Sequence, residues 1–566
     1  MVEPKKLKNL VIARAEPRTV AWATRRRVDF LPALCYNAGM EGLKQFPIGM
    51  QDFAQIRRNG YYYVDKTKLV HKMTHTSRFY FLSRPRRFGK SLLVSTLKCY
   101  FEGRKDLFEG LAMEKLEAEW RQHPVFLMSF AGNKYTCGKD LADTLNYKLS
   151  EWEKAYGIIP GETGAWGVRF ERVITAAHEQ TGAEPVVLVD EYDAPLLDTM
   201  DDPDLQIKLK QEMRKFFSPL KDLGGILRFV FLTGITKFSQ LSIFSELNNL
   251  KIMTMNDDYA AICGITKEEL LAQMQPEIQA LADKQGLSYD EAVDALAQKY
   301  DGYHFSKNSP DVYNPFSLIN SLSDGELTNY WFATGTPTVL TKLIQKYRMD
   351  VELFDKDFPA TQNMFDAPAE TATDPIPLLY QSGYLTIKET RKGGRYMLGF
   401  PNDEVRYGFM NCLLPYYATE TVSQNDTFLM AFSDALEDGD LEQALTLMKA
   451  FLSSVPYNAE RQDENHYKTL FYLIARLCTP FVVRTEEASA AGRSDMVVET
   501  EKAVYVFEFK LDGTVDDALE QIDGKGYLIP YLGRTGADGK PKHLYKVGVS
   551  FDGATRTLGG WKVREG

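Results

Sequence analysis

One segment of this 566-residue chain, Phe79 to Phe101, limits its fold more than any other. It opens with a short apolar run, Phe79–Leu82, which has the length and composition of a buried strand. From Ser91 onward, apolar residues recur at helical spacing. The loop between these two stretches ends in Gly-Lys-Ser, and a glycine-rich turn ahead of a helix presents backbone amides that surround a polyphosphate. The segment therefore predicts a strand, a phosphate-binding loop and a helix in succession.

The loop departs from the usual GxxxxGK[ST] pattern because Arg84 stands where the first glycine is expected. Pro85 fixes one backbone angle and helps the chain to turn without that glycine. The Lys90 ammonium favours the bound anion, and the Ser91 hydroxyl is placed to ligate Mg²⁺. The predicted nucleotide contacts are Arg84, Pro85, Arg86, Arg87, Phe88, Gly89, Lys90, Ser91 and Leu92. The alternative for the three arginines is a solvated basic turn.

An acidic pair, Asp190 and Glu191, follows a continuous apolar run that is typical of a strand buried in a parallel sheet. In a P-loop protein, the aspartate in this place holds Mg²⁺ and the glutamate orients or deprotonates the attacking water. The alternative is an acidic loop that caps a buried strand. Because the loop and the acidic pair occur in the expected order, each at a strand end, together they predict an ATP site with Mg²⁺.

A third apolar run, Arg228–Gly234, is of the same kind. A polar residue at its end, Thr233, is our candidate for sensing the γ-phosphate, and Lys237 is a candidate source of positive charge for the transition state. The alternative is that Thr233 is a β-branched strand end with no such role.

Strands that alternate with helical stretches indicate an α/β sheet covered on both faces. Residues from Thr266 to Lys299 have helical patterning. Farther on, the strand-like runs Tyr384–Ile387 and Tyr396–Phe400 flank a glycine-containing turn, Arg391–Gly394, which predicts a hairpin of the kind found as the wing of a winged-helix module.

Near the C-terminus, two strand-like runs carry Asp495, Glu508 and Lys510. Side chains alternate along a strand, so Glu508 and Lys510 point to the same face, where Asp495 from the neighbouring strand can join them. Two carboxylates bind a hard cation such as Mg²⁺, and the lysine can position the nucleophile or neutralise charge. Glu464, on a preceding helix, is a candidate further ligand. The alternative is a cross-strand ion pair without catalysis.

Composition narrows the range of functions. The net charge of −10 argues against a uniformly basic nucleic-acid coat, although residues 1–27 are rich in Lys and Arg. No apolar stretch has the roughly 18 residues that a membrane span needs. Six scattered cysteines without a CxxC pair favour a reduced, cytoplasmic protein over a disulfide-bonded or zinc-ribbon one.

The chain resembles the AAA-ATPase-like family of bacterial proteins, in which such an ATPase is paired with a C-terminal PD-(D/E)XK nuclease-like domain. The resembling segments are Phe46–Gly49, Gly60–Thr67, Phe81–Ser91, Val189–Asp193, Phe231–Phe238 and Tyr300–Tyr303. Arg84 belongs to that family's own loop. The pattern Asp495-(x)12-Glu508-x-Lys510 is similar to the nuclease signature, although Ser494 replaces its proline, and Gln521 resembles the accessory glutamine.

The resemblance implies an α/β fold class: a P-loop NTPase domain, a helical and winged-helix-like middle region, and a restriction-endonuclease-like domain. The expected parts are a basic, disordered tail (1–45), the ATPase (46–265), the helical lid and winged-helix-like region (266–420), a helical connector (421–456) and the nuclease-like domain (457–566).

The leading hypothesis is an ATPase that controls a Mg²⁺-dependent nuclease acting on DNA or RNA, with homo-oligomerisation left open. The first alternative is a nucleotide-dependent sensor or scaffold whose nuclease-like domain is inactive. The second is an ATPase without a nucleic-acid partner.

Overall fold

The computed structural model describes residues 44–160, 165–236, 250–333, 358–365, 374–417, 422–454, 464–478, 482–489, 492–536, 538–554 and 557–566. The tail predicted for residues 1–45 thus lies almost wholly outside the described residues. None of the described helices combines the length and the apolar character that a membrane crossing requires.

Five parallel strands form the sheet of the N-terminal half, in the order β2-β3-β4-β1-β5. They are β1 (Phe79–Ser83), β2 (Val125–Ser129), β3 (Val186–Asp190), β4 (Phe229–Gly234) and β5 (Lys251–Ile252). Every residue of β1, β3 and β4 is buried, as their continuous apolar runs predicted. Because the strands are parallel, the ends of β1, β3 and β4 meet at one edge, where open α/β sheets bind their ligands.

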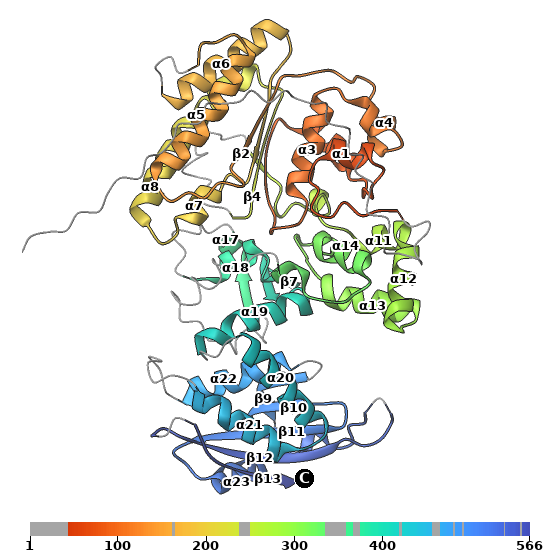
Figure 1. Cartoon of the computed structure of the whole chain (residues 1–566), viewed down its shortest axis with the longest axis vertical. Coiled ribbons are helices and arrows are strands. Elements are labelled where there is room, and N and C mark those ends of the chain that lie inside the picture. Colours follow the sequence, from red (N-terminus) through yellow and green to blue (C-terminus); the bar gives the residue numbers. More distant parts are fainter. Residues whose placement is uncertain are drawn as a thin grey trace, which may run out of the picture. The chain divides into compact units, whose positions relative to one another are not determined.

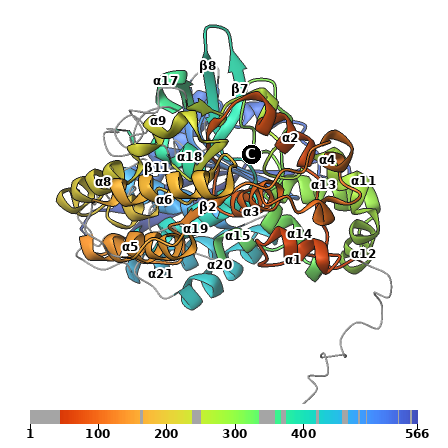
Figure 2. The ribbon, with the colours of Figure 1, turned by 90° about the horizontal axis from the view of Figure 1, so that it is seen from above.

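Helices cover both faces of this sheet. In Figure 1, α5, α6 and α8 lie on one side of the strands, and α1, α3 and α4 lie on the other; Figure 2 gives the view from above. The helical elements of this half are α1 (Phe53–Arg58), α2 (Thr67–Thr76), α3 (Lys90–Phe101), η1 (Lys105–Phe108), α4 (Ala112–Leu116), α5 (Gly138–Ala155), α6 (Trp166–Thr181), α7 (Ala194–Asp198), α8 (Pro203–Phe217), α9 (Pro219–Asp222) and η2 (Leu223–Gly225).

A helical region follows and confirms the helical patterning of residues 266–299. Its elements are η3 (Asp257–Tyr259), α11 (Lys267–Gln273), α12 (Gln275–Gln285), α13 (Tyr289–Tyr300), α14 (Pro315–Asp324) and α15 (Tyr330–Ala333). Two of these helices begin with a capping box, in which Thr266 pairs with Glu269 and Ser288 pairs with Glu291. Leu270, Ile278, Leu281, Leu296 and Leu318 belong to a separate apolar core for this region.

The predicted hairpin is present as part of a three-stranded antiparallel sheet, β6-β8-β7. The elements here are β6 (Phe358–Thr361), α17 (Gln362–Phe365), α18 (Ile376–Ser382), β7 (Thr386–Arg391), β8 (Arg395–Gly399) and α19 (Asp403–Tyr417). The first strand starts two residues later than predicted, because the amides of Tyr384 and Leu385 still bond back to Leu379 O at the end of α18. Gly393 and Gly394 both have positive φ and form the predicted turn.

One buried carboxylate, Glu404 on α19, joins three helices. Its oxygens accept hydrogen bonds from the Trp331 backbone N–H of α15 and the Ser317 hydroxyl of α14, each at 2.7 Å. Burial raises the pKa of Glu404 to about 7, although these hydrogen bonds and nearby Lys299 favour the ionised form. Glu404 is therefore a group whose proton is held more tightly in the folded protein than in the unfolded chain.

We expect Glu404→Gln to change the pH dependence of stability. The stabilising contribution of the Glu404 proton is complete below the ordinary pKa of 4.5 and is lost as the pH rises through about 7. Glutamine carries no such loss, so the stability of the variant relative to wild type should rise between about pH 5 and pH 8, by on the order of 3 kcal/mol. Denaturant unfolding at a series of pH values measures this difference. The exposed Glu268→Gln is the control, and identical profiles for wild type and Glu404→Gln would contradict the assignment.

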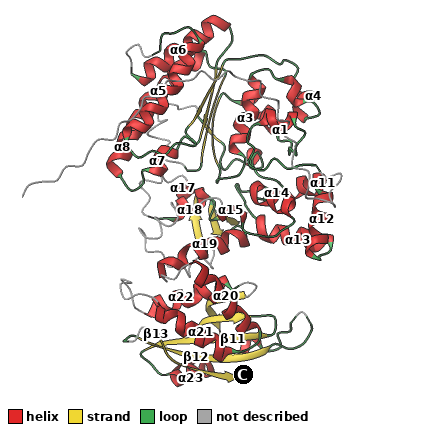
Figure 3. Ribbon diagram, in the orientation of Figure 1, coloured by secondary structure: helices red, strands yellow, loops and turns green. Residues whose placement is uncertain are grey.

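The C-terminal region contains a five-stranded mixed sheet, β13-β12-β11-β10-β9, in which only the β11–β12 pair is parallel (Figure 3). Its elements, with the helices that precede it, are α20 (Val422–Glu437), α21 (Leu441–Ser454), α22 (Glu464–Leu477), β9 (Val482–Ser489), β10 (Gly492–Glu499), β11 (Ala503–Leu511), α23 (Val515–Lys525), η5 (Ile529–Tyr531), β12 (His543–Asp552) and β13 (Thr557–Glu565). The parallel pair is joined through α23, as a βαβ unit requires. The whole chain therefore has the predicted α/β fold class.

Strand β11 is buried on both faces, and its side chains divide between them. Val504 and Val506 belong to an apolar cluster with Leu519 and Ile522 of α23. Phe507 and Phe509 instead contact Phe471 of α22 on the opposite face. Alternation therefore assigns residue 508 to the α23 face.

Candidate nucleotide site and carboxylate site

The phosphate loop turns at Gly89, whose φ of 88° places it in the left-handed region that glycine adopts without strain. Helix α3 begins at the next residue, Lys90, so the N-terminal amides of the helix lie next to the loop. Arg87 also has a positive φ, of 68°. The sequence therefore produces the predicted strand, loop and helix in the predicted order.

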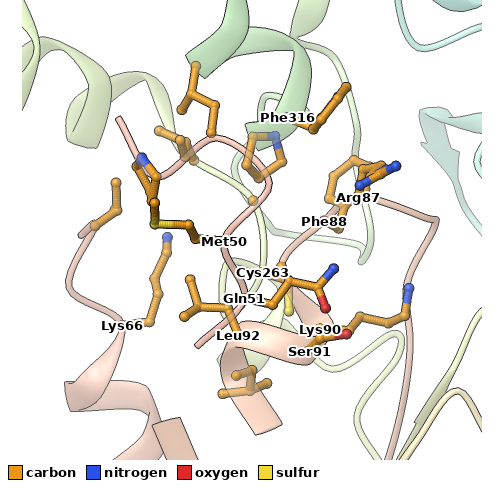
Figure 4. A pocket seen from close by; sticks show the side chains of 18 of the residues that line it. Met50, Gln51, Lys66, Arg87, Phe88, Lys90, Ser91, Leu92, Cys263 and Phe316 are labelled. Carbon is orange, nitrogen blue, oxygen red and sulfur yellow. The ribbon is translucent and has the colours of Figure 1, made fainter. Parts of the chain in front are cut away.

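A cavity of about 470 Å³ lies against this loop (Figure 4). Lys66, Arg86, Arg87, Lys90 and Glu191 are its charged lining residues. Much of the remaining wall is apolar and comes from Pro47, Met50, Tyr62, Val64, Ile262, Ile265, Met274, Pro315, Phe316 and Ile319. A cavity lined by both cationic and apolar side chains suits a nucleotide, which has a charged phosphate part and a largely apolar base.

Lys90 is buried, and its Nζ donates to the loop carbonyl of Pro85 at 2.9 Å. Burial lowers the pKa of Lys90, while the nearby Glu191 and Asp190 favour the charged ammonium. Leu92 and Ser91 line the same cavity.

Asp190 is a buried carboxylate at the end of β3, and it is the residue predicted to hold Mg²⁺ beside the loop. Burial raises its pKa, and a hydrogen bond with Ser91 opposes that rise. Its Oδ1 has no hydrogen-bonding partner in the structure. A buried oxygen without a partner beside a serine hydroxyl fits the ligand set of a Mg²⁺ ion, so the residues agree with the predicted metal role. Glu191 lines the cavity with a φ of 51°.

Arg84 has a different role from the one predicted. Arg84 is 1% exposed, which excludes a solvated basic turn, and it is not among the residues that line the cavity. The guanidinium donates to the carbonyl oxygens of Ser83 and Thr254 at 3.0 and 2.8 Å and, more weakly, to those of Tyr259 and Ala260. It also lies 4.1 Å from the ring centroid of Phe305, and its backbone N–H is bonded to Gly234 O. Arg84 therefore holds the strand ends together beneath the loop.

We expect Arg84→Met to destabilise the protein by about 3 kcal/mol or more, because it leaves several buried carbonyl groups without a donor. Burial already lowers the pKa of Arg84 to about 10, so the charge is desolvated in the native state. The midpoint of denaturant unfolding measures the loss. Exposed Arg58→Met is the matched control and should stay within about 0.5 kcal/mol of wild type. Equal midpoints for the two variants would contradict this role for Arg84.

The remaining loop residues divide between packing and the cavity. Phe88 is buried against Tyr303 and Phe305. Pro85 packs so closely on Gly383 that a Cβ there would lie 2.5 Å from the proline ring. The guanidinium of Arg87 stacks 4.7 Å from the Phe316 ring centroid at the cavity wall. The carbonyl of Arg86 accepts a hydrogen bond from the Trp331 indole at 3.2 Å.

The hydroxyl of Thr233 donates to Leu82 O at 2.9 Å, which joins β4 to β1 and agrees with the strand-end alternative. Lys237 lies outside the described residues. Sequence reasoning gave no role to Asp193, whose Oδ2 accepts three hydrogen bonds, from Ile235 N, Thr236 N and Thr236 Oγ1, at 3.0, 2.7 and 2.7 Å. Asp193 thus fixes the chain that follows β4. Its position three residues after Asp190 was the only sequence signal.

The carboxylates of the C-terminal sheet meet where β10 and β11 separate. The last paired residues of β10 and β11 at this end are Met496 and Phe507. The next residues, Asp495 and Glu508, therefore lie opposite each other on the same face of the sheet. Beyond this point, an Asp495 oxygen replaces the missing ladder bond by accepting from Phe509 N at 2.8 Å. Lys510 Nζ donates to Glu508 Oε1 at 3.1 Å and to Gln521 Oε1 of α23 at 2.8 Å. The structure therefore brings Asp495, Glu508, Lys510 and Gln521 together.

Glu508 is the buried member of this group, with 2% of its side chain exposed. Burial raises the pKa of Glu508 to about 7, and the nearby Asp495 charge adds to the rise. Its Oε2 has no partner. An unpartnered buried oxygen beside a second carboxylate fits a divalent cation, so these residues agree with the predicted metal role.

Sequence reasoning missed Lys468, which donates from α22 to Asp495 Oδ1 at 2.9 Å. It lies one helical turn after Glu464, and that spacing was the available signal. Glu464 begins α22, but its side chain lies outside the described part of the structure.

A parallel sheet with a phosphate loop and an acidic strand end, followed by a mixed sheet with a carboxylate–lysine group, defines a P-loop protein with a nuclease-like C-terminal domain. Residues 47–244 match the family described as "Predicted AAA-ATPase", and residues 462–561 match the PD-(D/E)XK nuclease superfamily. An uncharacterized protein in the vnfD 5′ region of Azotobacter chroococcum mcd 1 is 36% identical over 532 residues, which cover 92% of this chain and 99% of that relative. The chain belongs to this family of AAA-ATPase-like proteins with a C-terminal PD-(D/E)XK nuclease-superfamily domain.

Among solved structures, the chain is similar to the ORC1 protein of Aeropyrum pernix in complex with DNA. The sequences are 12% identical, the match covers 62% of this chain and 91% of that one, and the TM-score is 0.22.

Proposed function

We propose that this protein binds and hydrolyses ATP at its phosphate loop and cleaves nucleic acid at the Asp495–Glu508 group, with the first site controlling the second. The observation that carries the nuclease part is the unpartnered, buried Oε2 of Glu508, held beside Asp495 and Lys510. A carboxylate of this kind is costly to bury unless a cation completes its surroundings.

At the nucleotide site, Ser91 and Asp190 would hold Mg²⁺, Lys90 and the amides around Gly89 would bind the phosphates, and Glu191 would orient the attacking water. At the carboxylate site, Asp495 and Glu508 are the metal ligands, Lys510 positions the nucleophile, and Gln521 holds Lys510 in place. Mg²⁺ held by these residues would supply charge neutralisation on the phosphate and would favour an ionised nucleophile.

Control of one site by the other is supported by a series of contacts. Phe316 lines the nucleotide cavity, and the neighbouring Ser317 is bonded to Glu404 of α19. Helix α19 packs against α22, whose Lys468 reaches Asp495. A change in the cavity wall on nucleotide binding thus has a contiguous route to the carboxylates.

The second candidate is a nucleotide-dependent sensor or scaffold with an inactive nuclease-like domain. It is favoured by the lysine partners of both carboxylates, since Lys468 pairs with Asp495 and Lys510 with Glu508. A site in which lysines already balance the carboxylates has less need of a metal ion.

An assay of purified protein with ATP and either Mg²⁺ or Mn²⁺ separates the two candidates. Cleavage of single-stranded DNA, double-stranded DNA or RNA that stops on metal chelation supports the nuclease. If the protein hydrolyses ATP but cleaves none of these substrates with either metal, the result supports the sensor or scaffold and rejects the nuclease. We also propose that the protein is cytoplasmic and forms a homo-oligomer; the five free cysteines in the described part of the chain agree with a reducing compartment.

A further inference from the structure

A histidine–glutamate group lies apart from both sites, at the C-terminal end of α2. His71 and His75 are four residues apart and occupy one face of this helix, with ring centroids 4.0 Å apart. Glu117, just after α4, approaches them, and its Oε2 lies 3.5 Å from His75 Nε2. One candidate ligand atom from each of the three residues lies within 4.8 Å of the others. We propose that His71, His75 and Glu117 bind a divalent transition metal ion of the zinc class.

The chemistry of the group matches that ion. Two imidazoles and one carboxylate form a three-ligand set that zinc accepts, with a fourth position open to water. Ligands at the usual zinc distances lie about 3.4 Å apart in a tetrahedral site, so closure around the ion needs shifts of about 1 Å. His75 has 43% of its side chain exposed, which allows such a shift and leaves the site accessible.

Each ligand is oriented by a neighbouring group. His75 Nδ1 lies 2.9 Å from the backbone oxygen of His71, which leaves Nε2 to face Glu117. His71 makes a hydrogen bond with the backbone of Leu116. Glu117 accepts from the Tyr100 hydroxyl at 2.5 Å and from the Glu119 N–H at 2.9 Å. Metal-binding histidines commonly have one nitrogen fixed by a carbonyl in this way.

Burial, hydrogen bonds and the neighbouring imidazole also favour the ligand-competent protonation states. Burial and the neighbouring His75 lower the pKa of His71 and so favour its neutral form. At Glu117 burial favours the neutral acid, but hydrogen bonds from Tyr100 and Glu119 outweigh it and the pKa is lowered. The C-terminal end of α2 adds the negative end of a helix dipole, which attracts a cation. The ion would join α2 to the segment after α4. Two residues separate the end of α2 from β1, the strand that leads to the phosphate loop.

Zinc titration of chelator-stripped, full-length protein against a chromophoric chelator tests the site. The experiment uses the Glu508→Gln protein as background, so that the C-terminal carboxylates do not contribute. We expect one fewer zinc equivalent, or an affinity lower by at least about 10-fold, in His71→Gln and in His75→Gln. The matched control is His178→Gln, which removes a histidine that also lies against a backbone carbonyl, at 2.9 Å, and it should bind zinc as the background does.

Tyr100→Phe keeps all three ligands and removes only the hydroxyl that holds Glu117, so it should weaken zinc binding by about 10-fold. Cobalt(II) added to the background protein should give the visible absorption of a tetrahedral site, and His75→Gln should remove it. If His71→Gln and His75→Gln bind the same number of zinc ions with the same affinity as the background protein, the proposal is overturned. The three residues then form only an ion pair. If neither variant folds, unchanged zinc affinity in Tyr100→Phe overturns it instead.

Discussion

Lys90→Ala is expected to lower ATP hydrolysis by about 100-fold or more, the cost of removing one preorganised donor from a charged transition state. Lys90 is buried at the start of α3 and lines the cavity beside Glu191. Its removal also leaves Asp190, Glu191 and Asp193 without the cation that lies near them, which disfavours a polyanion in the same cavity. Nucleotide binding should weaken together with hydrolysis, since the ammonium contacts phosphate in the ground state as well.

Two measurements check this expectation. Steady-state phosphate release gives the hydrolysis rate, and the rise in unfolding temperature on adding Mg²⁺–ATP reports binding. A ligand at 100 times its dissociation constant stabilises the native state by roughly 2.7 kcal/mol. That rise should shrink or vanish in Lys90→Ala and persist in Lys98→Ala, which removes a lysine of the same helix whose side chain is 42% exposed. Equal nucleotide binding and hydrolysis in wild type and Lys90→Ala would exclude this loop as the nucleotide site.

Strands β1, β3 and β4 of the N-terminal sheet could be predicted because each is short, apolar and followed by a polar turn, whereas the two-residue strand β5 carries no such run. Continuous apolar runs arise when both faces of a parallel strand are covered, and β1, β3 and β4 are buried along their whole lengths. The convergence of Asp495, Glu508 and Lys510 was equally accessible, since the two-residue period of a strand and an antiparallel neighbour determine which side chains share a face.

The direction of a side chain at a loop or strand end has no such period. Arg84 occupies a loop position from which a guanidinium can point toward phosphate or toward the core. The choice depends on carbonyl groups of residues 254, 259 and 260, about 170 positions away in the sequence. Lys66 shows the same dependence on distant residues: it lines the cavity, but it is paired at 2.6 Å with Glu269, whose side chain completes the capping box of α11. Contacts of this kind are set by tertiary packing, which local pattern does not contain.

The contact of Lys468 with Asp495 also could not be predicted from the sequence. A lysine on an amphipathic helix is usually a solvated residue, and only the packing of α22 on β11 brings it to Asp495. A metal ion at the carboxylate site must therefore compete with this ammonium for Asp495.

Glu508→Gln is expected to lower metal-dependent cleavage of nucleic acid by about 10³-fold, because a metal ion contributes several kcal/mol of transition-state stabilisation and this change removes one of its two carboxylates. The amide matches the carboxylate in shape, so the fold should persist. Glutamine does not carry the penalty of ionisation that raises the pKa of Glu508 to about 7, and the unfolding midpoint above that pH should therefore equal or exceed that of wild type. Loss of activity without loss of stability distinguishes a metal ligand from a structural residue.

The matched control is Glu520→Gln, which removes an exposed carboxylate from α23 next to Gln521 and should retain wild-type cleavage. Calorimetric titration with Mn²⁺ gives a second readout that needs no substrate: wild type should bind an ion that Glu508→Gln does not, and the ATP site should remain intact in both. Lys468→Ala tests the competition directly, since without that ammonium Asp495 is freer to bind the ion and Mn²⁺ affinity should rise. If Mn²⁺ binds wild type and Glu508→Gln equally, and Lys468→Ala changes nothing, the carboxylates are balanced by lysine alone. The protein would then act through its nucleotide site as a sensor.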